Sequence, residues 1–212
     1  MPFFSPHRQY NSRVIRTLSF LSLFLVTAAY GQQQQSGDAL VKALRQGGYV
    51  IVMRHASSPR EVPDKATANP DNLKPERQLD QEGRASATAM GKELRDLKIP
   101  IGSVLTSPTY RALETIRYAQ FGKPEAFPEL GDNGQSMQGG TEAQATWLRK
   151  KVTEFPKGTN TLIVTHMPNM SRAFPESTNN LADGEALIFG PSGVVARVKI
   201  EEWNGLLKET LK

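Results

Sequence analysis

The sequence contains no cysteine, and this absence removes several classes of site. Disulfide scaffolds, thiolate zinc sites and cysteine nucleophiles are excluded, while the redox compartment stays open because a chain without thiols tolerates either one. Long apolar runs are also scarce, and the run over residues 18–29 is too short to span a bilayer comfortably. With 38% apolar and 22% charged residues in 212, the composition suits one globular domain and excludes a disordered chain.

The first 31 residues have the features of a secretory leader. They hold three arginines and no acidic residue, and the apolar run 18–29 ends in Ala29-Tyr30-Gly31, a small-x-small pattern. A basic region, a short apolar core and a small-residue cleavage site are typical of a signal peptide, although an uncleaved leader would serve as an anchor. We therefore predict a signal peptide over 1–31, a polar spacer over 32–37 and a domain over 38–212, in a periplasmic or secreted protein.

The net charge of +5 depends largely on the leader. Three of the 26 basic residues lie in residues 1–31, which leaves 23 basic against 21 acidic residues, close to +2. A charge-based argument for nucleic-acid binding mostly disappears with the leader. We expect no nucleic-acid partner and no stable membrane insertion after cleavage, and we leave the oligomeric state open.

Apolar periodicity predicts strands that alternate with helices. Continuous apolar runs at 49–53 and 161–164 are typical of strands buried on both faces. Further strands are expected at 104–105 and in a hairpin of 186–189 with 194–200, and helices over 38–45, 80–97, 108–119 and 141–155. This order predicts an α/β sandwich with a mainly parallel sheet, in which ligands bind beyond the carboxyl ends of the strands.

Histidine is rare enough for each position to be informative. Of the three histidines, His7 lies in the leader, and His55 and His166 each follow a predicted buried strand directly. Two strands of one parallel sheet would present both imidazoles at the same rim. Two independent, hydrogen-bonded histidines are the alternative interpretation.

Two arginines lie at matching places. Arg54 immediately precedes His55, and Arg111 falls in the first turn of the helix that follows the strand at 104–105. A guanidinium group binds phosphate through two parallel hydrogen bonds and stays charged at any working pH. Two arginines, two histidines and a helix N-terminus around one point would make an anion pocket. An ordinary surface helix arginine is the alternative for Arg111.

These residues resemble the motifs of a known family. Arg54-His55-Ala56 after a hydrophobic strand resembles the Arg-His-Gly signature of the histidine phosphatase superfamily, the phosphoglycerate-mutase-like group. Ser107-Pro108-x-x-Arg111-Ala112-x-x-Thr115 is similar to its second arginine motif, and Val164-Thr165-His166 to its second histidine. The departure is Ala56 in place of glycine, and its methyl group should be tolerated if the local φ is negative.

The resemblance implies a fold and a mechanism. The fold would be a three-layer α/β sandwich with a mainly parallel central sheet, and the activity that of a phosphatase of an exported, non-mutase branch. His55 would attack phosphorus and form a phosphohistidine, while Arg54, Arg111 and His166 would hold the non-bridging oxygens. The substrate would be a small phosphorylated molecule, and the mechanism needs no cofactor and no metal.

The general acid is left open among three carboxyl groups. Asp132 occupies the place where much of this family carries an acidic residue, with Glu129 as its neighbour, and Glu185 starts the strand after the second-histidine segment. For each one, a solvated acid is the alternative. Arg60 would extend the phosphate pocket from the loop 56–79, and this loop and the segment 167–182 would shape substrate choice.

Other functions remain open on the same residues. A protein-phosphohistidine phosphatase fits the motifs, although an exported location argues against it. A catalytically silent phosphate- or glycan-binding module would keep the arginines and lose turnover. A metal held by His55 and His166 is disfavoured, because no carboxylate stands at ligand spacing from either histidine. Among exported phosphatases, a sugar phosphate is one candidate substrate.

Overall fold

The computed structural model describes residues 1, 3, 37–132 and 140–206. The predicted leader and spacer fall almost entirely outside these residues, so their assignment stays a prediction. The elements, in chain order, are α1 (Gly37–Gln46), β1 (Val50–Arg54), α2 (Gln81–Asp96), β2 (Ile101–Thr106), α3 (Tyr110–Ala119), β3 (Glu125–Ala126), η1 (Pro128–Leu130), α4 (Glu142–Lys151), β4 (Asn160–Thr165), α5 (Met167–Ala173), η2 (Pro175–Ser177), β5 (Ala186–Gly190), β6 (Gly193–Val198) and η3 (Glu202–Gly205).

The strands form one six-stranded sheet in the order β3-β2-β4-β1-β5-β6. The four strands from β3 to β1 are parallel, and β5 and β6 continue the sheet in antiparallel pairing as the predicted hairpin. The expectation of a mainly parallel sheet is confirmed. The functional consequence is that the carboxyl ends of β1, β2 and β4, which are adjacent in the sheet, meet at one edge.

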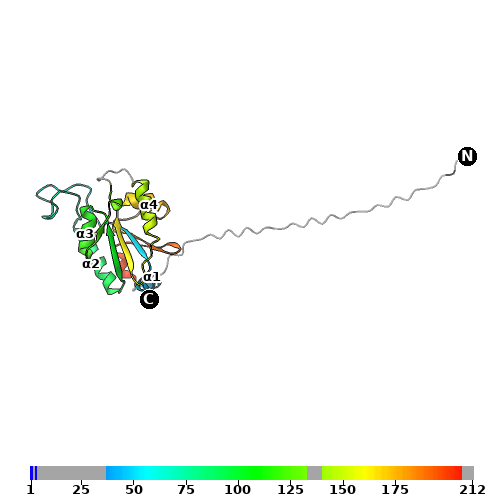
Figure 1. Ribbon diagram of the computed structural model, residues 1–212, viewed down its shortest axis with the longest axis horizontal. Coiled ribbons are helices and arrows are strands. Elements are labelled where there is room, and N and C mark those ends of the chain that lie inside the picture. The colour runs from blue at the N-terminus through cyan, green and yellow to red at the C-terminus, as the bar shows by residue number, and fades with distance from the viewer. Residues whose placement is uncertain (2, 4–36, 133–139, 207–212) are drawn as a thin grey trace. The chain divides into compact units, whose positions relative to one another are not determined.

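Helices cover both faces of the sheet, in three layers (Figure 1). Along β1, Ile51 and Met53 belong to the core that includes α1, α2 and α3, whereas Val50 and Val52 belong to the core that includes α4 and α5. Successive side chains of a strand point to opposite faces, so a continuous apolar run is needed where both faces are buried. The predicted three-layer sandwich is confirmed.

Two predicted helix boundaries were wrong. The helix predicted to reach residue 155 ends at Lys151, because Pro156 disfavours helical backbone at Phe155 and the chain turns before it. The helix predicted from residue 108 begins at Tyr110. Ser107 accepts a hydrogen bond from the Thr109 backbone N–H over 3.2 Å, which keeps Thr109 extended as the residue before the helix.

The strand predictions missed length rather than position. β2 extends over Ile101–Thr106 instead of two residues, and β6 ends at Val198 rather than at residue 200. The segment 167–182, for which no helix was predicted, contains α5, whose first turn carries Pro168. Proline fits the start of a helix because the N–H that it lacks has no partner there.

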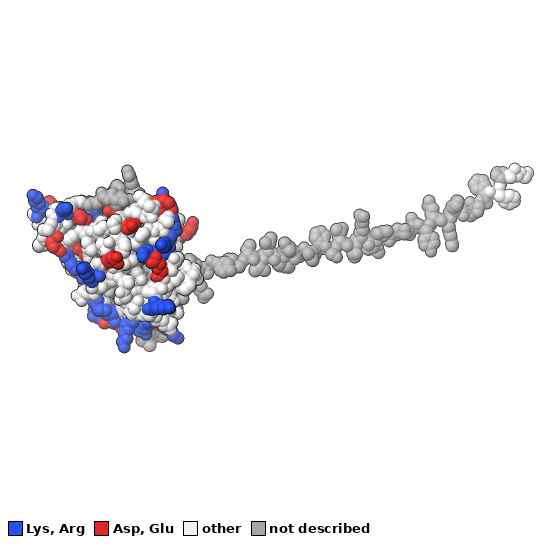
Figure 2. Space-filling view, in the orientation of Figure 1, with Lys and Arg blue, Asp and Glu red and all other residues white. Residues whose placement is uncertain are grey.

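The surface and the helices add two observations. Both signs of charge occur across the face shown in Figure 2, as the nearly balanced count outside the leader suggests. Within the described ranges, no helix has the length and hydropathy needed to cross a membrane.

Candidate active site

His55 and His166 meet at the carboxyl edge of the sheet. β1 and β4 are parallel neighbours with Arg54 opposite Thr165, so the residue after each strand reaches the same rim. The two ring centroids lie 5.3 Å apart with their planes inclined by 61°, and both residues are buried. The strands therefore bring the two imidazoles together, as their positions in the sequence predict.

The hydrogen bonds of His55 define which of its ring nitrogens is free of a proton. Nδ1 lies 2.8 Å from the carbonyl oxygen of Ala56, and since a carbonyl only accepts, Nδ1 carries the hydrogen. Nε2 in turn accepts a hydrogen bond from Arg111 Nε over 3.1 Å. Burial, reinforced by His166 and the Arg111 guanidinium, holds the pKa of His55 well below its usual 6.5. Nε2 therefore presents a lone pair at neutral pH.

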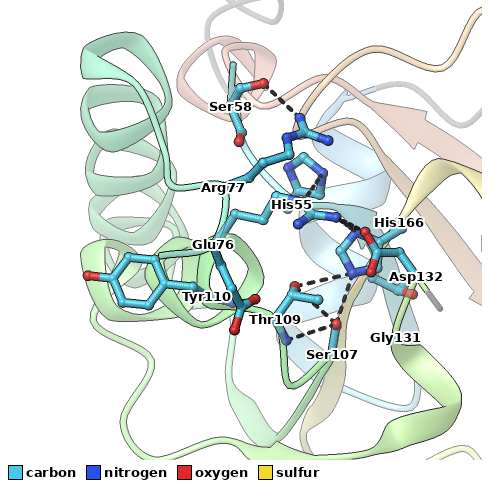
Figure 3. Close-up of polar contacts among 12 residues, drawn as sticks. His55, Ser58, Glu76, Arg77, Ser107, Thr109, Tyr110, Gly131, Asp132 and His166 are labelled. Carbon is cyan, nitrogen blue, oxygen red and sulfur yellow. Dashed lines mark hydrogen bonds and ion pairs between the residues drawn. The ribbon is translucent and has the colours of Figure 1, made fainter. Parts of the chain in front are cut away.

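His166 adopts the opposite tautomer. Its Nδ1 accepts from Arg111 Nη2 over 3.1 Å, which leaves the hydrogen on Nε2 to be donated to Ser107 Oγ over 2.8 Å (Figure 3). Burial is the main cause that lowers the pKa of His166, followed by the positive charges of Arg111, Arg77 and Arg54. Both histidines are thus neutral and lie beside the positive charges of Arg54, Arg77 and Arg111, which we call the cationic cluster.

Arg111 links the components of this cluster. It lies in the first turn of α3, is 2% exposed, and donates to His55, His166 and the carboxylate of Asp132. The side chain of Asp132 is 9% exposed, so this ion pair is nearly dry. A buried guanidinium held by three partners, through Nε and Nη2, has one fixed orientation, which is what preorganised binding of an oxyanion requires.

Arg54, the residue before His55, contacts a different acid. Its Nη2 lies 2.6 Å from Asp183 Oδ1, and its Nη1 donates to the carbonyl oxygen of Leu181 over 3.2 Å. The Arg54 side chain is 25% exposed and that of Asp183 is 34% exposed. This pair therefore lies nearer to solvent than Arg111 and Asp132.

Two of the guanidinium nitrogens have no hydrogen-bond partner among the described residues. They are Arg54 Nε and Arg111 Nη1, and both are buried. Buried donors without a partner are rare, because a buried donor that lacks its hydrogen bond costs about 1–3 kcal/mol of stability. An oxyanion beside His55 would offer acceptors to both.

Ala56 has a negative φ, the condition under which its methyl group was expected to be tolerated. Among the described non-glycine residues, positive φ occurs at Lys98, Gln120 and Asn180, so Ala56 does not need the conformational freedom of glycine. Its methyl group is fully buried, and its N–H donates to Thr115 Oγ1 over 3.1 Å. The backbone thus accommodates alanine where the motif that this segment resembles has glycine.

The three acidic candidates occupy different environments. Asp132 is the one that contacts the cluster, through Arg111. Glu185 accepts from Arg197 and from the Ala182 N–H over 2.7 and 2.9 Å. Burial raises the pKa of Glu185, but the hydrogen bonds from Arg197 and the Ala182 N–H, together with the positive charges of Arg197 and Lys199, outweigh it, and the net direction is downward. The carboxylate of Glu185 is thus engaged with Arg197 on β6 and makes no polar contact with either histidine among the described residues.

Glu129 lies on η1 and is half-buried, with no contact to the histidines among the described residues. Arg60 is exposed and likewise makes no polar contact within the described ranges, so the structure does not bring it to the cluster. Both remain candidates by sequence position alone.

Arg77 is a site residue that the sequence did not single out. Its guanidinium donates to the carbonyl oxygens of Ser58 and Pro59 over 2.9 and 2.6 Å, and it lies beside His55 in Figure 3. Burial lowers the pKa of Arg77, and the positive charge of Arg111 lowers it further. The sequence feature that could have identified Arg77 is its position just before Leu79 and the helix cap Asp80, where a long loop must become ordered.

The described residues contain no group of three or more histidine, aspartate and glutamate side chains arranged to hold a metal ion. The site presents a neutral imidazole surrounded by guanidinium donors. Such a group can attack an electrophilic phosphorus, and its neighbours can hold the oxygens.

No protein-family model matches the chain, and no curated protein matches it. Solved structures do match. The protein histidine phosphatase SixA complexed with tungstate is 20% identical, with a TM-score of 0.47, over 71% of this chain and 92% of that one. Bacillus stearothermophilus YhfR is 17% identical with a TM-score of 0.46, over 66% and 89% of the two chains. Phosphoserine phosphatase from Entamoeba histolytica is 11% identical with a TM-score of 0.45, over 71% and 93%. Likenesses at this level assign no function by themselves.

Proposed function

We propose that this protein is a phosphomonoester hydrolase that works through a phosphohistidine on His55. The observation that carries the proposal is the tautomer of His55, whose unprotonated Nε2 faces the guanidinium of Arg111. A nucleophile with its lone pair directed at a preorganised cation is arranged to meet a phosphoryl group that the cation binds.

The first step transfers the phosphoryl group to the enzyme. A phosphate ester would enter between Arg54, Arg77 and Arg111, whose N–H groups neutralise the equatorial oxygens of a loose transition state. The Nδ1 atom of His166 accepts a hydrogen bond from Arg111, so the ring hydrogen is on Nε2. This N–H donates to Ser107 Oγ and can donate to a substrate oxygen in its place. His55 Nε2 forms the bond to phosphorus as the ester P–O bond breaks.

The second step returns the enzyme to its resting state. Water attacks the phosphorus of the phosphohistidine, and the P–N bond breaks with its electron pair returning to Nε2. Inorganic phosphate leaves with the oxygen of the water, and a proton of the water passes to a base. The hydrogen bond from Nδ1 to the Ala56 carbonyl supports the positive charge that the ring carries while it is phosphorylated.

Release of p-nitrophenol from p-nitrophenyl phosphate tests this function. We expect turnover by the purified protein that persists in EDTA, and loss of turnover to the background in His55→Ala. A silent phosphate- or glycan-binding module would bind inorganic phosphate and release no product. Activity that returns only with a divalent ion would contradict the proposed mechanism.

We also propose that the protein acts outside the cytoplasm, on a small phosphorylated molecule such as a sugar phosphate. The support is the leader pattern of residues 1–31. N-terminal sequencing of the protein recovered from cell fractions should give a chain that starts just after Gly31 in the exported fraction. A full-length chain confined to the cytoplasm would contradict this proposal and would favour a phosphoprotein substrate.

A further inference from the structure

Asp183 lies next to the proposed nucleophile, although nothing in its sequence context marks it out. The backbone N–H of Gly184 donates to the carbonyl oxygen of His55 over 2.9 Å, which places the turn before β5 beside that residue. Gly184 has φ of +71°, and a Cβ there would lie 2.8 Å from Ile200 side-chain atoms. The turn therefore requires glycine at position 184, and its hydrogen bond to His55 ties the backbone next to Asp183 to that of the nucleophile.

The two aspartates of the cluster hold different arginines at different depths. Asp132 pairs with Arg111, and its side chain is 9% exposed, while Asp183 pairs with Arg54 and is 34% exposed. In an in-line transfer the leaving oxygen departs on the side of phosphorus opposite His55. The leaving group must also reach solvent, which favours the more exposed of the two carboxyl groups as its proton donor.

The charges around Asp183 favour uptake of a proton when substrate binds. Burial raises the pKa of Asp183, and the cations Arg54 and Arg77 oppose this rise while Asp80 adds to it. A bound phosphate dianion would neutralise these cations and place further negative charge beside the carboxylate. Both effects favour the protonated form of a carboxyl group.

We propose that Asp183 is the general acid of the proposed hydrolase, an inference that rests on the function proposed above. As His55 Nε2 forms its bond to phosphorus and the ester P–O bond breaks, the Asp183 carboxyl proton moves to the leaving oxygen and an alcohol departs. In the second step the Asp183 carboxylate takes a proton from the attacking water. Asp132 then serves to orient Arg111.

This assignment defines the substrate class. An alkoxide is a poor leaving group and needs a proton, whereas a nitrophenolate or an imidazole leaves with much less help. A dedicated acid at the mouth therefore indicates an O-phosphomonoester of an aliphatic alcohol, including a sugar, rather than a phosphohistidine protein.

The test compares two substrates across matched variants. Glycerol 2-phosphate has an alkoxide leaving group, and 2,4-dinitrophenyl phosphate has a strongly stabilised one. We expect Asp183→Asn to lower kcat/KM on glycerol 2-phosphate by about 10²-fold or more. The fold-loss in kcat/KM on dinitrophenyl phosphate should be smaller by a factor of about ten or more. Asp132→Asn should lose similar factors on both, and the exposed Asp96→Asn on α2 serves as the neutral control.

Equal losses on both substrates in Asp183→Asn, or a selective loss on the alkyl ester in Asp132→Asn, would overturn the assignment. Wild-type protein that hydrolyses neither ester would refute the proposed function itself. A second measurement needs no variant: with an acid in place, kcat/KM of the wild type should vary little across substituted phenyl phosphates. A steep dependence on the acidity of the phenol would overturn the inference even if Asp183→Asn failed to fold.

Discussion

The carboxylate of Glu114 accepts the backbone N–H of Leu79 over 2.7 Å. Glu114 is 1% exposed, and its other oxygen accepts from Asn69 Nδ2 over 2.8 Å. Because Glu114 lies on α3, one turn after Arg111, the helix that presents one arginine also holds the loop that carries Arg77. Two cationic groups from distant parts of the chain thus share one support.

Replacing Glu114 with glutamine should weaken substrate binding more than chemistry. A glutamine offers one acceptor oxygen to donors that now share two, so the loop loses a buried hydrogen bond and Arg77 loses its fixed position. We expect KM for p-nitrophenyl phosphate to rise about three- to tenfold with a smaller change in kcat. The exposed Glu142→Gln on α4 is the matched control. A fall in kcat at constant KM would contradict a positioning role for Glu114.

Arg77 should contribute more to phosphate binding than Arg60 does. Arg77 lies in the cluster, while Arg60 is exposed, so Arg77→Ala should raise KM and the inhibition constant of inorganic phosphate by about ten- to a hundredfold. Steady-state kinetics of Arg77→Ala and Arg60→Ala measure the contrast. A larger effect at Arg60 would restore the prediction made from sequence position.

Arg111 should be irreplaceable even by another cation. Arg111→Ala should cost about 2–4 kcal/mol in kcat/KM, the range for one lost preorganised donor. Arg111→Lys should recover little of this, because an ammonium group cannot donate to His55, His166 and Asp132 in one plane. Urea unfolding monitored by circular dichroism controls for loss of fold. A folded Arg111→Ala variant within twofold of wild type would remove Arg111 from the site.

The positions of the histidines and of Arg111 could be predicted because strands specify them. A continuous apolar run identifies a buried strand, and the residue after it belongs to the carboxyl edge of the sheet, whatever the rest of the fold does. That logic located His55 and His166, and Arg111 was found because it lies in the first turn of the helix that follows β2. It needs only local periodicity and the tendency of consecutive α/β strands to run parallel.

Arg77 could not be predicted in this way. The segment 56–79 has no period, and its course depends on side-chain contacts such as those of Asn72, which bonds both the N–H and the carbonyl of Glu76 over 3.0 and 2.9 Å. Likewise, Glu185 and Asp183 are two residues apart, and yet Glu185 pairs with Arg197 on β6 whereas Asp183 pairs with Arg54. Such pairings arise from tertiary packing, which the local pattern does not contain.

Stability should fall as the pH drops below about 6.5. The pKa values of His55 and His166 are lowered in the folded state, whereas the unfolded chain protonates them near their ordinary value of about 6.5. The unfolded state then binds more protons, so each histidine reduces stability by up to about 1.4 kcal/mol per pH unit below that value. This loss of stability with falling pH ends at the pKa of each histidine in the folded protein, below which both states bind the proton.

Urea midpoints between pH 8 and pH 5 measure this dependence. The double variant His55→Asn/His166→Asn should show a shallower decline than the wild type over the same range. The lowered pKa of Glu185 acts in a separate window, below about 4.5, and leaves the comparison intact. Equal slopes for the two proteins would mean that the histidines are protonated in the folded state.

The most direct test of the account is to trap the phosphoryl group on the enzyme. The protein is mixed with p-nitrophenyl phosphate, quenched in alkali within the first turnover, digested and analysed by mass spectrometry. We predict one phosphoryl group on the peptide that contains His55, stable in alkali, lost in acid, and absent from His55→Ala. A phosphoryl group on a serine, or turnover that continues in His55→Ala, would contradict the central claim.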